Sequence, residues 1–202
     1  MRFRSLGVAV FFTIFSGSIA AAAPAGSDEL GKLQINITSK NSDIVIDKTL
    51  GDVRAVFQNY QPAVDGSTKI KSPVQVSGSS TRPFMEVTME KCVLFICQTV
   101  NMKADISVKD VSGKCTKNFI LRADLTRSSE ILANVYDSLD VAVCYQRSTD
   151  GQGTLIFMGS AHHAPGYSGG PVQNEIYQLL KLQIDPIGAA TKKVLKIYGA
   201  TL

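Results

Sequence analysis

Residues Asn174–Tyr198, NEIYQLLKLQIDPIGAATKKVLKIY, form the longest amphipathic segment that the sequence predicts as helix. Apolar side chains recur along it at helical spacing, while Lys192, Lys193 and Lys196 lie towards the other side. Asn174 is expected to cap this helix, and Pro186 is expected to kink or restart it, because proline cannot donate the helical hydrogen bond. A helix of this length and amphipathicity must cover an apolar surface, which the rest of the chain has to supply.

Strands with one apolar face supply that surface. Alternation of apolar and polar residues predicts half-buried strands, and their hairpin spacing favours an antiparallel meander. Pro73 places one of them at a sheet edge. Residues 128–136 fit either a strand or a short helix. The alternating segments are 33–37 continued by Ile44 and Ile46, 69–77, 84–90, 100–109, 119–125, 139–145 and 155–159.

A short helix is expected between the first strands and the meander. Val53, Val56, Phe57 and Tyr60 fall on one helical face, and the preceding Thr49–Asp52 resembles a capping box with Asp in place of Glu. The sequence thus predicts an α+β fold in which a curved antiparallel sheet wraps a long C-terminal helix, with a short helix after the first strands.

This order of elements resembles the helix-grip fold of the START-like superfamily, which includes polyketide cyclases, aromatases and lipid-transfer proteins. The matching stretches are Ile44–Tyr60, expected as a strand running into a helix, and Asn174–Tyr198, expected as the gripped helix. The resemblance implies a cavity between sheet and helix. A curved sheet and a straight helix also cannot touch along their whole length, so an apolar gap remains unless large side chains fill it.

The candidate ligand-binding residues are the inward-facing members of the clearest strands and the helix residues opposite them. Their alternative role is to pack against one another as a filled core. The candidates are Met102, Ala104, Ile106, Phe119, Leu121, Val141, Val143, Phe157, Leu179, Leu180, Ile187 and Val194.

The N-terminus predicts export. Arg2 and Arg4 precede an apolar run, Val8–Phe15, and small residues follow that signal peptidase can cleave after Ala22. A membrane anchor is the alternative, but this run is shorter than the roughly 20 residues that a spanning helix needs. We therefore expect a signal peptide at residues 1–22, a flexible leader at 23–31 and one domain at 32–202, in a periplasmic or secreted protein without a transmembrane segment.

The four cysteines predict two disulfides in an exported chain, for which three pairings are possible. Cys92 and Cys97 could close a local loop, which would leave Cys115 to meet Cys144 across neighbouring strands. The spacing does not favour a metal, and no cofactor is expected. The net charge of +4 falls to about +2 without Arg2 and Arg4, which argues against a nucleic-acid partner.

The segment Gly166–Val172, GYSGGPV, resembles the sequence around the nucleophile of chymotrypsin-like serine proteases. That resemblance implies Ser168 as nucleophile, with the amides of Ser168 and Gly166 as oxyanion donors. The family's upstream histidine is missing, since the chain's two histidines are His162 and His163. The simpler interpretation is a turn-rich loop joining the last strand to the last helix, with the histidines at its rim, one facing inward and one outward.

Three functional hypotheses follow from the sequence. The first is non-catalytic binding of an apolar small molecule or lipid between sheet and helix. The second is a structural or protein-interaction module of the cell envelope with a filled core. The third is a serine hydrolase that uses Ser168 with His162 or His163.

Overall fold

The computed structural model describes residues 26–93, 96–167, 169 and 171–202. Its sheet is antiparallel throughout, in the order β1-β8-β7-β6-β5-β4-β2, with β3 also pairing β4. The strands are β1 (Ser27–Ile37), β2 (Thr68–Ile70), β3 (Gln75–Gly78), β4 (Pro83–Val93), β5 (Ile96–Asp110), β6 (Lys117–Asp124), β7 (Tyr136–Arg147) and β8 (Gly153–His163). The helices are α1 (Ser42–Gly51), α2 (Val53–Gln58), α3 (Glu130–Ala133), α4 (Pro171–Lys181) and α5 (Ile184–Ile197).

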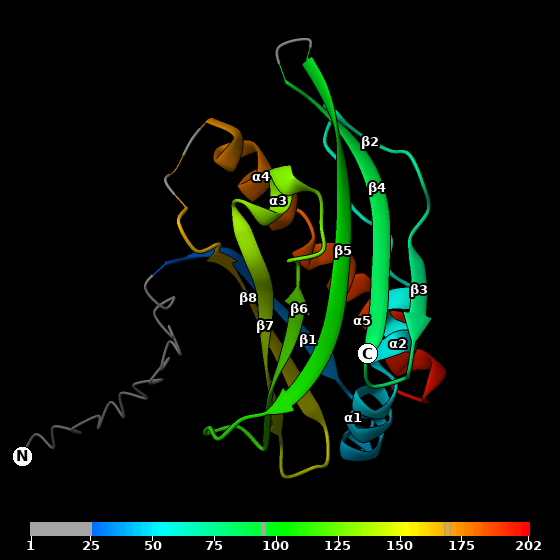
Figure 1. Ribbon diagram of the computed structural model, residues 1–202. Coiled ribbons are helices and arrows are strands. Elements are labelled where there is room, and N and C mark those ends of the chain that lie inside the picture. Colours follow the sequence, from blue (N-terminus) through cyan, green and yellow to red (C-terminus); the bar gives the residue numbers. More distant parts are fainter. Residues whose placement is uncertain (1–25, 94–95, 168, 170) are drawn as a thin grey trace, which may run out of the picture.

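The predicted fold class is confirmed. The sheet curls around the two C-terminal helices α4 and α5, and α1 and α2 lie at the end of the molecule where α5 finishes (Figure 1). Buried apolar side chains between sheet and helices form two clusters, one centred on α2, α4 and β4–β5 and the other on α1, β6–β8 and the end of α5. The predicted signal peptide and its cleavage site after Ala22 lie outside the described residues.

Helix α1 corrects the prediction of a strand through Ile44 and Ile46. Val45 and Ile46 are buried while Ile44 is 56% exposed, which is a helical pattern. Two isoleucines two residues apart could not distinguish a strand from one turn of helix. The stretch Ile44–Tyr60, expected as a strand running into a helix, is therefore two consecutive helices.

The predicted capping box is also corrected. The Thr49 hydroxyl donates to the carbonyl of Val45 within α1, at 2.8 Å. Asp52 caps the next helix instead, because its Oδ1 accepts a hydrogen bond from the amide of Ala55, at 3.2 Å. The helical face Val53–Tyr60 is confirmed as α2 and its last turn.

The leader predicted at residues 23–31 is wrong from Ser27 onward. Ser27–Gly31 belong to β1 and pair with β8, with Ser27 opposite His162 and Gly31 opposite Gly159. Backbone pairing to an existing strand needs no apolar side chains, so the small polar composition of this segment gave no signal.

The C-terminal helix is interrupted as predicted, although not at the predicted residues. Asn174 is not the cap but lies inside α4, which begins at Pro171, where a proline is well accommodated. The break falls at Leu182–Gln183, and Pro186 lies in the first turn of α5, where a missing amide proton costs no helical bond. The proposed edge strand at 69–77 is two short strands, β2 and β3, separated around Pro73, and residues 130–133 of the ambiguous segment are helical.

Both disulfides are present. Cys92 and Cys97 face each other across β4 and β5, and Cys115 joins Cys144 between the turn before β6 and strand β7. Of the three possible pairings, this is the one in which Cys92 and Cys97 close a local loop.

Helix α5 packs very closely on β1 and β8 at two glycines. A Cβ atom at Gly188 would lie 1.8 Å from a methyl carbon of Leu33, and one at Gly159 would lie 2.4 Å from Cδ1 of Ile184 and 3.2 Å from Cβ of Leu30. A larger residue at either position would have to displace the Leu33 or Ile184 side chain, so the two glycines let the helix lie close to this side of the sheet.

Adding a methyl group at this contact should destabilise the fold. We expect Gly159→Ala to lower the free energy of unfolding by about 1–3 kcal/mol in urea titrations, because Ile184 and Leu30 must move. The control is Gly51→Ala, at an exposed helical position with open space around it. That variant should be neutral or more stable by up to about 1 kcal/mol. Equal effects at both positions would contradict the close approach.

Candidate ligand-binding site

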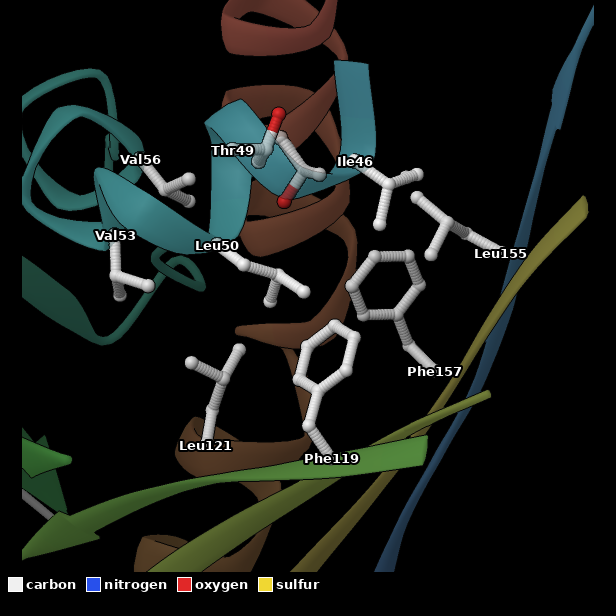
Figure 2. Close-up of a pocket in the computed structure, with 10 residues that line it drawn as sticks. Ile46, Thr49, Leu50, Val53, Val56, Phe119, Leu121, Leu155 and Phe157 are labelled. Carbon is white, nitrogen blue, oxygen red and sulfur yellow. The ribbon is translucent and has the colours of Figure 1, made fainter. Parts of the chain in front are cut away.

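Two small apolar cavities lie between the sheet and the helices. Cavity A has a volume of about 50 Å³ and lies between strands β4–β7 and the junction of α4 and α5. Cavity B has a volume of about 30 Å³ and lies between the sheet and α1, α2 and α5. In Figure 2 the Phe119 ring and the Leu121 side chain rise from the sheet towards Leu50 of α1 across cavity B.

The structure distributes the predicted site residues over three places. Met102, Ala104, Ile106, Leu121, Val141, Leu180 and Ile187 line cavity A. Phe119 and Phe157 line cavity B, together with Leu121. Val143, Leu179 and Val194 line neither cavity and are buried in the core.

Sequence reasoning missed the contribution of the first two helices and of the helix break. Cavity B takes Ile46, Leu50 and Val53 from α1 and α2, and cavity A takes Tyr60 and Gln183. The apolar face from Val53 to Tyr60 was a usable signal. The misassigned strand at residues 44–46 concealed that α1 and α2 cover the sheet together.

The gap between α5 and the middle of the sheet is incompletely filled. Leu121 and Leu139, on the inward face of β6 and β7, remain part-exposed, and so does Ile187 on the helix above them. Ala123 on the same face is also part-exposed. Apolar side chains on the concave face, under a helix, therefore keep some contact with solvent.

The hydrogen-bond donors of the polar side chains in the cavity walls are bonded to other groups of the protein. Gln183 is 6% exposed, and its Oε1 accepts hydrogen bonds from the Tyr60 hydroxyl at 2.6 Å and the Ala63 amide at 3.1 Å. Its Nε2 donates to the carbonyls of Leu179 and Ala63. All four hydrogen-bonding positions of this amide are filled, and burial raises the pKa of Tyr60 well above its usual value.

The threonines of cavity B are satisfied in the same way. Thr49 and Thr191 each donate to a carbonyl one helical turn back, at 2.8 Å. Arg122, which borders cavity A, directs its guanidinium to Ser138, to which Nη2 donates at 2.8 Å, and towards Asp140. The walls consequently present hydrocarbon rather than free donors to a ligand.

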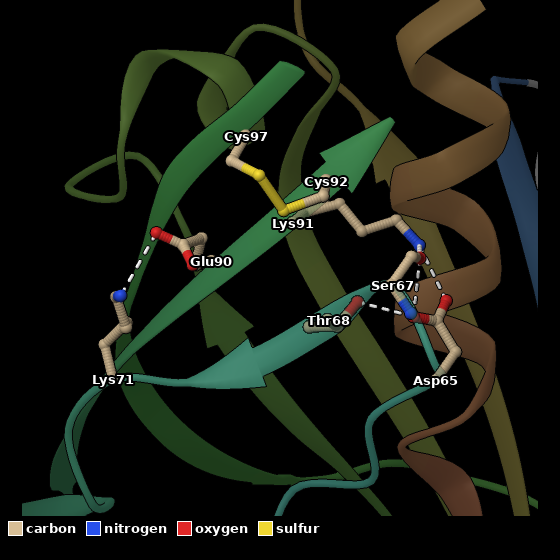
Figure 3. The surroundings of a disulfide bond; sticks show 8 residues. All are labelled: Asp65, Ser67, Thr68, Lys71, Glu90, Lys91, Cys92 and Cys97. Atoms are coloured by element: carbon tan, nitrogen blue, oxygen red, sulfur yellow. Dashed lines mark hydrogen bonds and ion pairs between the residues drawn. A yellow bond between two sulfur atoms is a disulfide. The ribbon is translucent and has the colours of Figure 1, made fainter. Parts of the chain in front are cut away.

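A buried lysine holds α4 to the edge of the sheet. Lys91, with its side chain 9% exposed, donates from Nζ to Asp65 at 2.6 Å and to Ser67 at 2.7 Å, and it lies 3.2 Å from Glu175 of α4. Figure 3 shows the ammonium of Lys91 beside Asp65 and Ser67, while the backbone of Lys91 adjoins Cys92 of the Cys92–Cys97 disulfide. Burial opposes ionisation of Asp65, but hydrogen bonds from Lys91, Thr68 and Ser67 outweigh it and hold its pKa well below the usual range.

The two histidines lie at the end of β8, and each faces a carboxylate. His162 Nε2 is 3.0 Å from Asp140 Oδ2, and His163 Nε2 is 3.0 Å from Asp28 Oδ2. As consecutive residues of β8 they point to opposite faces of the sheet, as predicted, with His163 stacked on buried Tyr136 and His162 beside Asp140; both are part-buried, at 23% and 21% exposure. The pairing of β7 and β8 shifts register between Tyr136 and Ser138, where Asp137 is the extra residue of β7.

The Asp28 carboxylate is the centre of a polar cluster. The Tyr136 hydroxyl donates to Oδ2 at 2.5 Å, and the His163 ring stacks between Tyr136 and Tyr167. Burial raises the pKa of Asp28, but the hydrogen bonds from Tyr136 and His163 outweigh it and lower the pKa overall. Ser168, the predicted nucleophile of the alternative hydrolase, lies outside the described residues.

Other kinds of site have little support in the described part of the chain. In residues 26–93, 96–167, 169 and 171–202, no three His, Cys, Asp or Glu side chains converge as metal ligands. Over the same ranges, no helix is both long and apolar enough to cross a membrane.

Comparisons with known proteins give structural neighbours of low sequence identity. No family model and no curated protein matches the sequence. Among solved structures, Ara h 8.0201 shares 14% identity, with 85% of this chain and 99% of that chain covered and a TM-score of 0.46. The Zhui aromatase/cyclase from Streptomyces sp. R1128 shares 12%, covering 85% and 93%, with a TM-score of 0.44. The major latex-like protein 151 of Panax ginseng shares 13%, covering 81% and 97%, with a TM-score of 0.38.

The chain has the helix-grip architecture, a curled antiparallel sheet around a C-terminal helix. The element order and the antiparallel topology that the sequence predicted are confirmed.

Removing the buried ammonium should weaken the attachment of α4. We expect Lys91→Met to lower the free energy of unfolding by about 1–2 kcal/mol at pH 7, because Asp65 and Glu175 lose their partner but stay partly hydrated. Lys71→Met is the matched control, since Lys71 is 51% exposed beside Glu90 on the same edge of the sheet, and it should change stability by less than about 0.5 kcal/mol.

The lysine variant should also alter the acid dependence of stability. The folded-state pKa of Asp65 is lowered, so its stabilising contribution is present above the unfolded pKa of about 4 and is lost as the pH falls below it. Urea unfolding at pH 7 and pH 3 should therefore show a smaller acid loss in Lys91→Met than in the wild type. An identical loss would mean that Lys91 does not stabilise the ionised Asp65.

Proposed function

We propose that the protein is exported and binds one apolar small molecule between the sheet and α5, without catalysing a reaction on it. The observation that carries the proposal is the unfilled gap under α5, where Leu121, Leu139 and Ile187 are apolar, inward-facing and part-exposed. Burying such surface against a ligand is favourable, at about 25 cal/mol per Å².

The cavity volumes set the size of the ligand. Ligand sites usually measure about 300–1,000 Å³, while the two spaces measure about 50 and 30 Å³. A whole lipid would therefore have to move α5 a long way from the sheet. A smaller molecule needs only side-chain movements, so it is the better match to the gap.

The same small volumes favour a second candidate function, the structural or protein-interaction module with a filled core. In that case the surface loops act and the two spaces remain empty packing defects. The two candidates differ in whether the gap is ever occupied, which can be measured.

Native mass spectrometry on protein purified from its own exported compartment, followed by solvent extraction, tests the proposal. We expect an apolar molecule at one copy per chain. Ala123→Phe should abolish ligand binding by filling cavity A. The control is Ala142→Phe, which should still bind the ligand. Ala142 lies on the opposite face of the sheet from the cavity, because its neighbours Val141 and Val143 face the core. A bare mass that a panel of apolar compounds leaves unchanged would favour the interaction module.

Export has its own test. We expect the expressed precursor to be recovered outside the cytoplasm, with a mature N-terminus at Ala23 and a mass four hydrogens below that of the reduced chain, as two disulfides require. N-terminal sequencing and intact-mass measurement read both. An uncleaved, fully reduced chain retained in the cytoplasm would contradict the proposal.

A further inference from the structure

Leu121 separates the two cavities. Among the described residues it is the one side chain that lines both cavity A and cavity B. Its backbone is fixed in the middle of β6 between Val108 of β5 and Val141 of β7, while its side chain is part-exposed and borders open space in both cavities. The Leu121 side chain can therefore change rotamer without moving the sheet.

The two cavities follow one another along the covering helices. On α5, Ile187 lines cavity A and Thr191, four residues later, lines cavity B. Four helical residues advance by about 6 Å. At α2, Tyr60 just after the helix lines cavity A and Val53 lines cavity B. If joined, the cavities would form one elongated space running along α5.

The chemistry of the walls restricts what can occupy that space. The donors of Gln183, Tyr60, Thr49 and Thr191 are all engaged within the protein. A carbonyl or ether oxygen buried there would lose its hydrogen bond to water without replacement, at a cost of about 1–3 kcal/mol. A hydrocarbon chain loses no hydrogen bond.

We propose that Leu121 is a movable partition and that the ligand is a linear hydrocarbon segment, which displaces the Leu121 side chain and spans both cavities. This inference rests on the proposed function and adds the shape and chemistry of the ligand. Leu121 then determines the length of ligand that the protein accepts.

Methyl-labelled NMR titrations with benzene, a compact probe, and n-butylbenzene, an elongated one, test the partition. In the wild type, n-butylbenzene should shift methyl signals in both cavities, those of Ile187 and Leu50. Leu121→Ala should bind n-butylbenzene at least ten-fold more tightly than the wild type and benzene less than three-fold more tightly. Leu121→Phe should weaken n-butylbenzene at least ten-fold, which keeps the test decisive if the alanine variant does not fold.

Leu139→Ala is the matched control, because Leu139 lines cavity A alone. This variant enlarges one cavity without joining the two, so its preference for n-butylbenzene over benzene should stay within three-fold of the wild type. If Leu139→Ala and Leu121→Ala change that preference equally, Leu121 does not act as a partition, but the proposed binding of an apolar molecule is not contradicted. If neither the wild type nor any of the variants binds benzene or n-butylbenzene, the proposed function itself is wrong.

Discussion

Helix α5 makes its closest contacts with the sheet on one side. Glycines 159 and 188 remove the side chains that would hold the helix away from β1 and β8, so Ile184 and Leu33 fill the contact directly. A curved sheet cannot meet a straight helix equally closely along its whole width. Close contact at β1 and β8 therefore leaves the space over β5–β7 less filled, and the two cavities form around that space.

Polar anchors hold the helices over this gap without opening it to polar ligands. Gln183 joins the break between α4 and α5 to Tyr60 and Ala63, and Lys91 joins α4 to the edge of the sheet. At the far end, the Tyr198 hydroxyl donates to Asp52 at 2.8 Å, beside the start of α2. Because each anchor satisfies its own hydrogen bonds, the remaining wall is hydrocarbon.

Alternation and helical spacing were sufficient to predict the sheet and the C-terminal helices, and the even number of cysteines predicted two disulfides, with the observed pairing as one of three possibilities. They failed where the pattern was short or where backbone pairing alone holds a segment, as at Ile44–Ile46 and Ser27–Gly31. The inward faces of β5 and β6 were predictable from alternation, but which of their residues border a cavity was not. Which residues border a cavity depends on how closely α5 approaches the sheet. The presence of Gly159 and Gly188 in the sequence does not reveal that distance.

The central claim is that the space under α5 is apolar and can be occupied. A crystal structure of the protein under xenon pressure tests it most directly, because xenon enters dry apolar cavities and is readily located. The account predicts xenon atoms on both sides of Leu121, one bordered by Leu180 and Ile187 and the other by Leu50 and Phe119. A crystal with no xenon at either place, and with Leu121 packed against both walls, would contradict it.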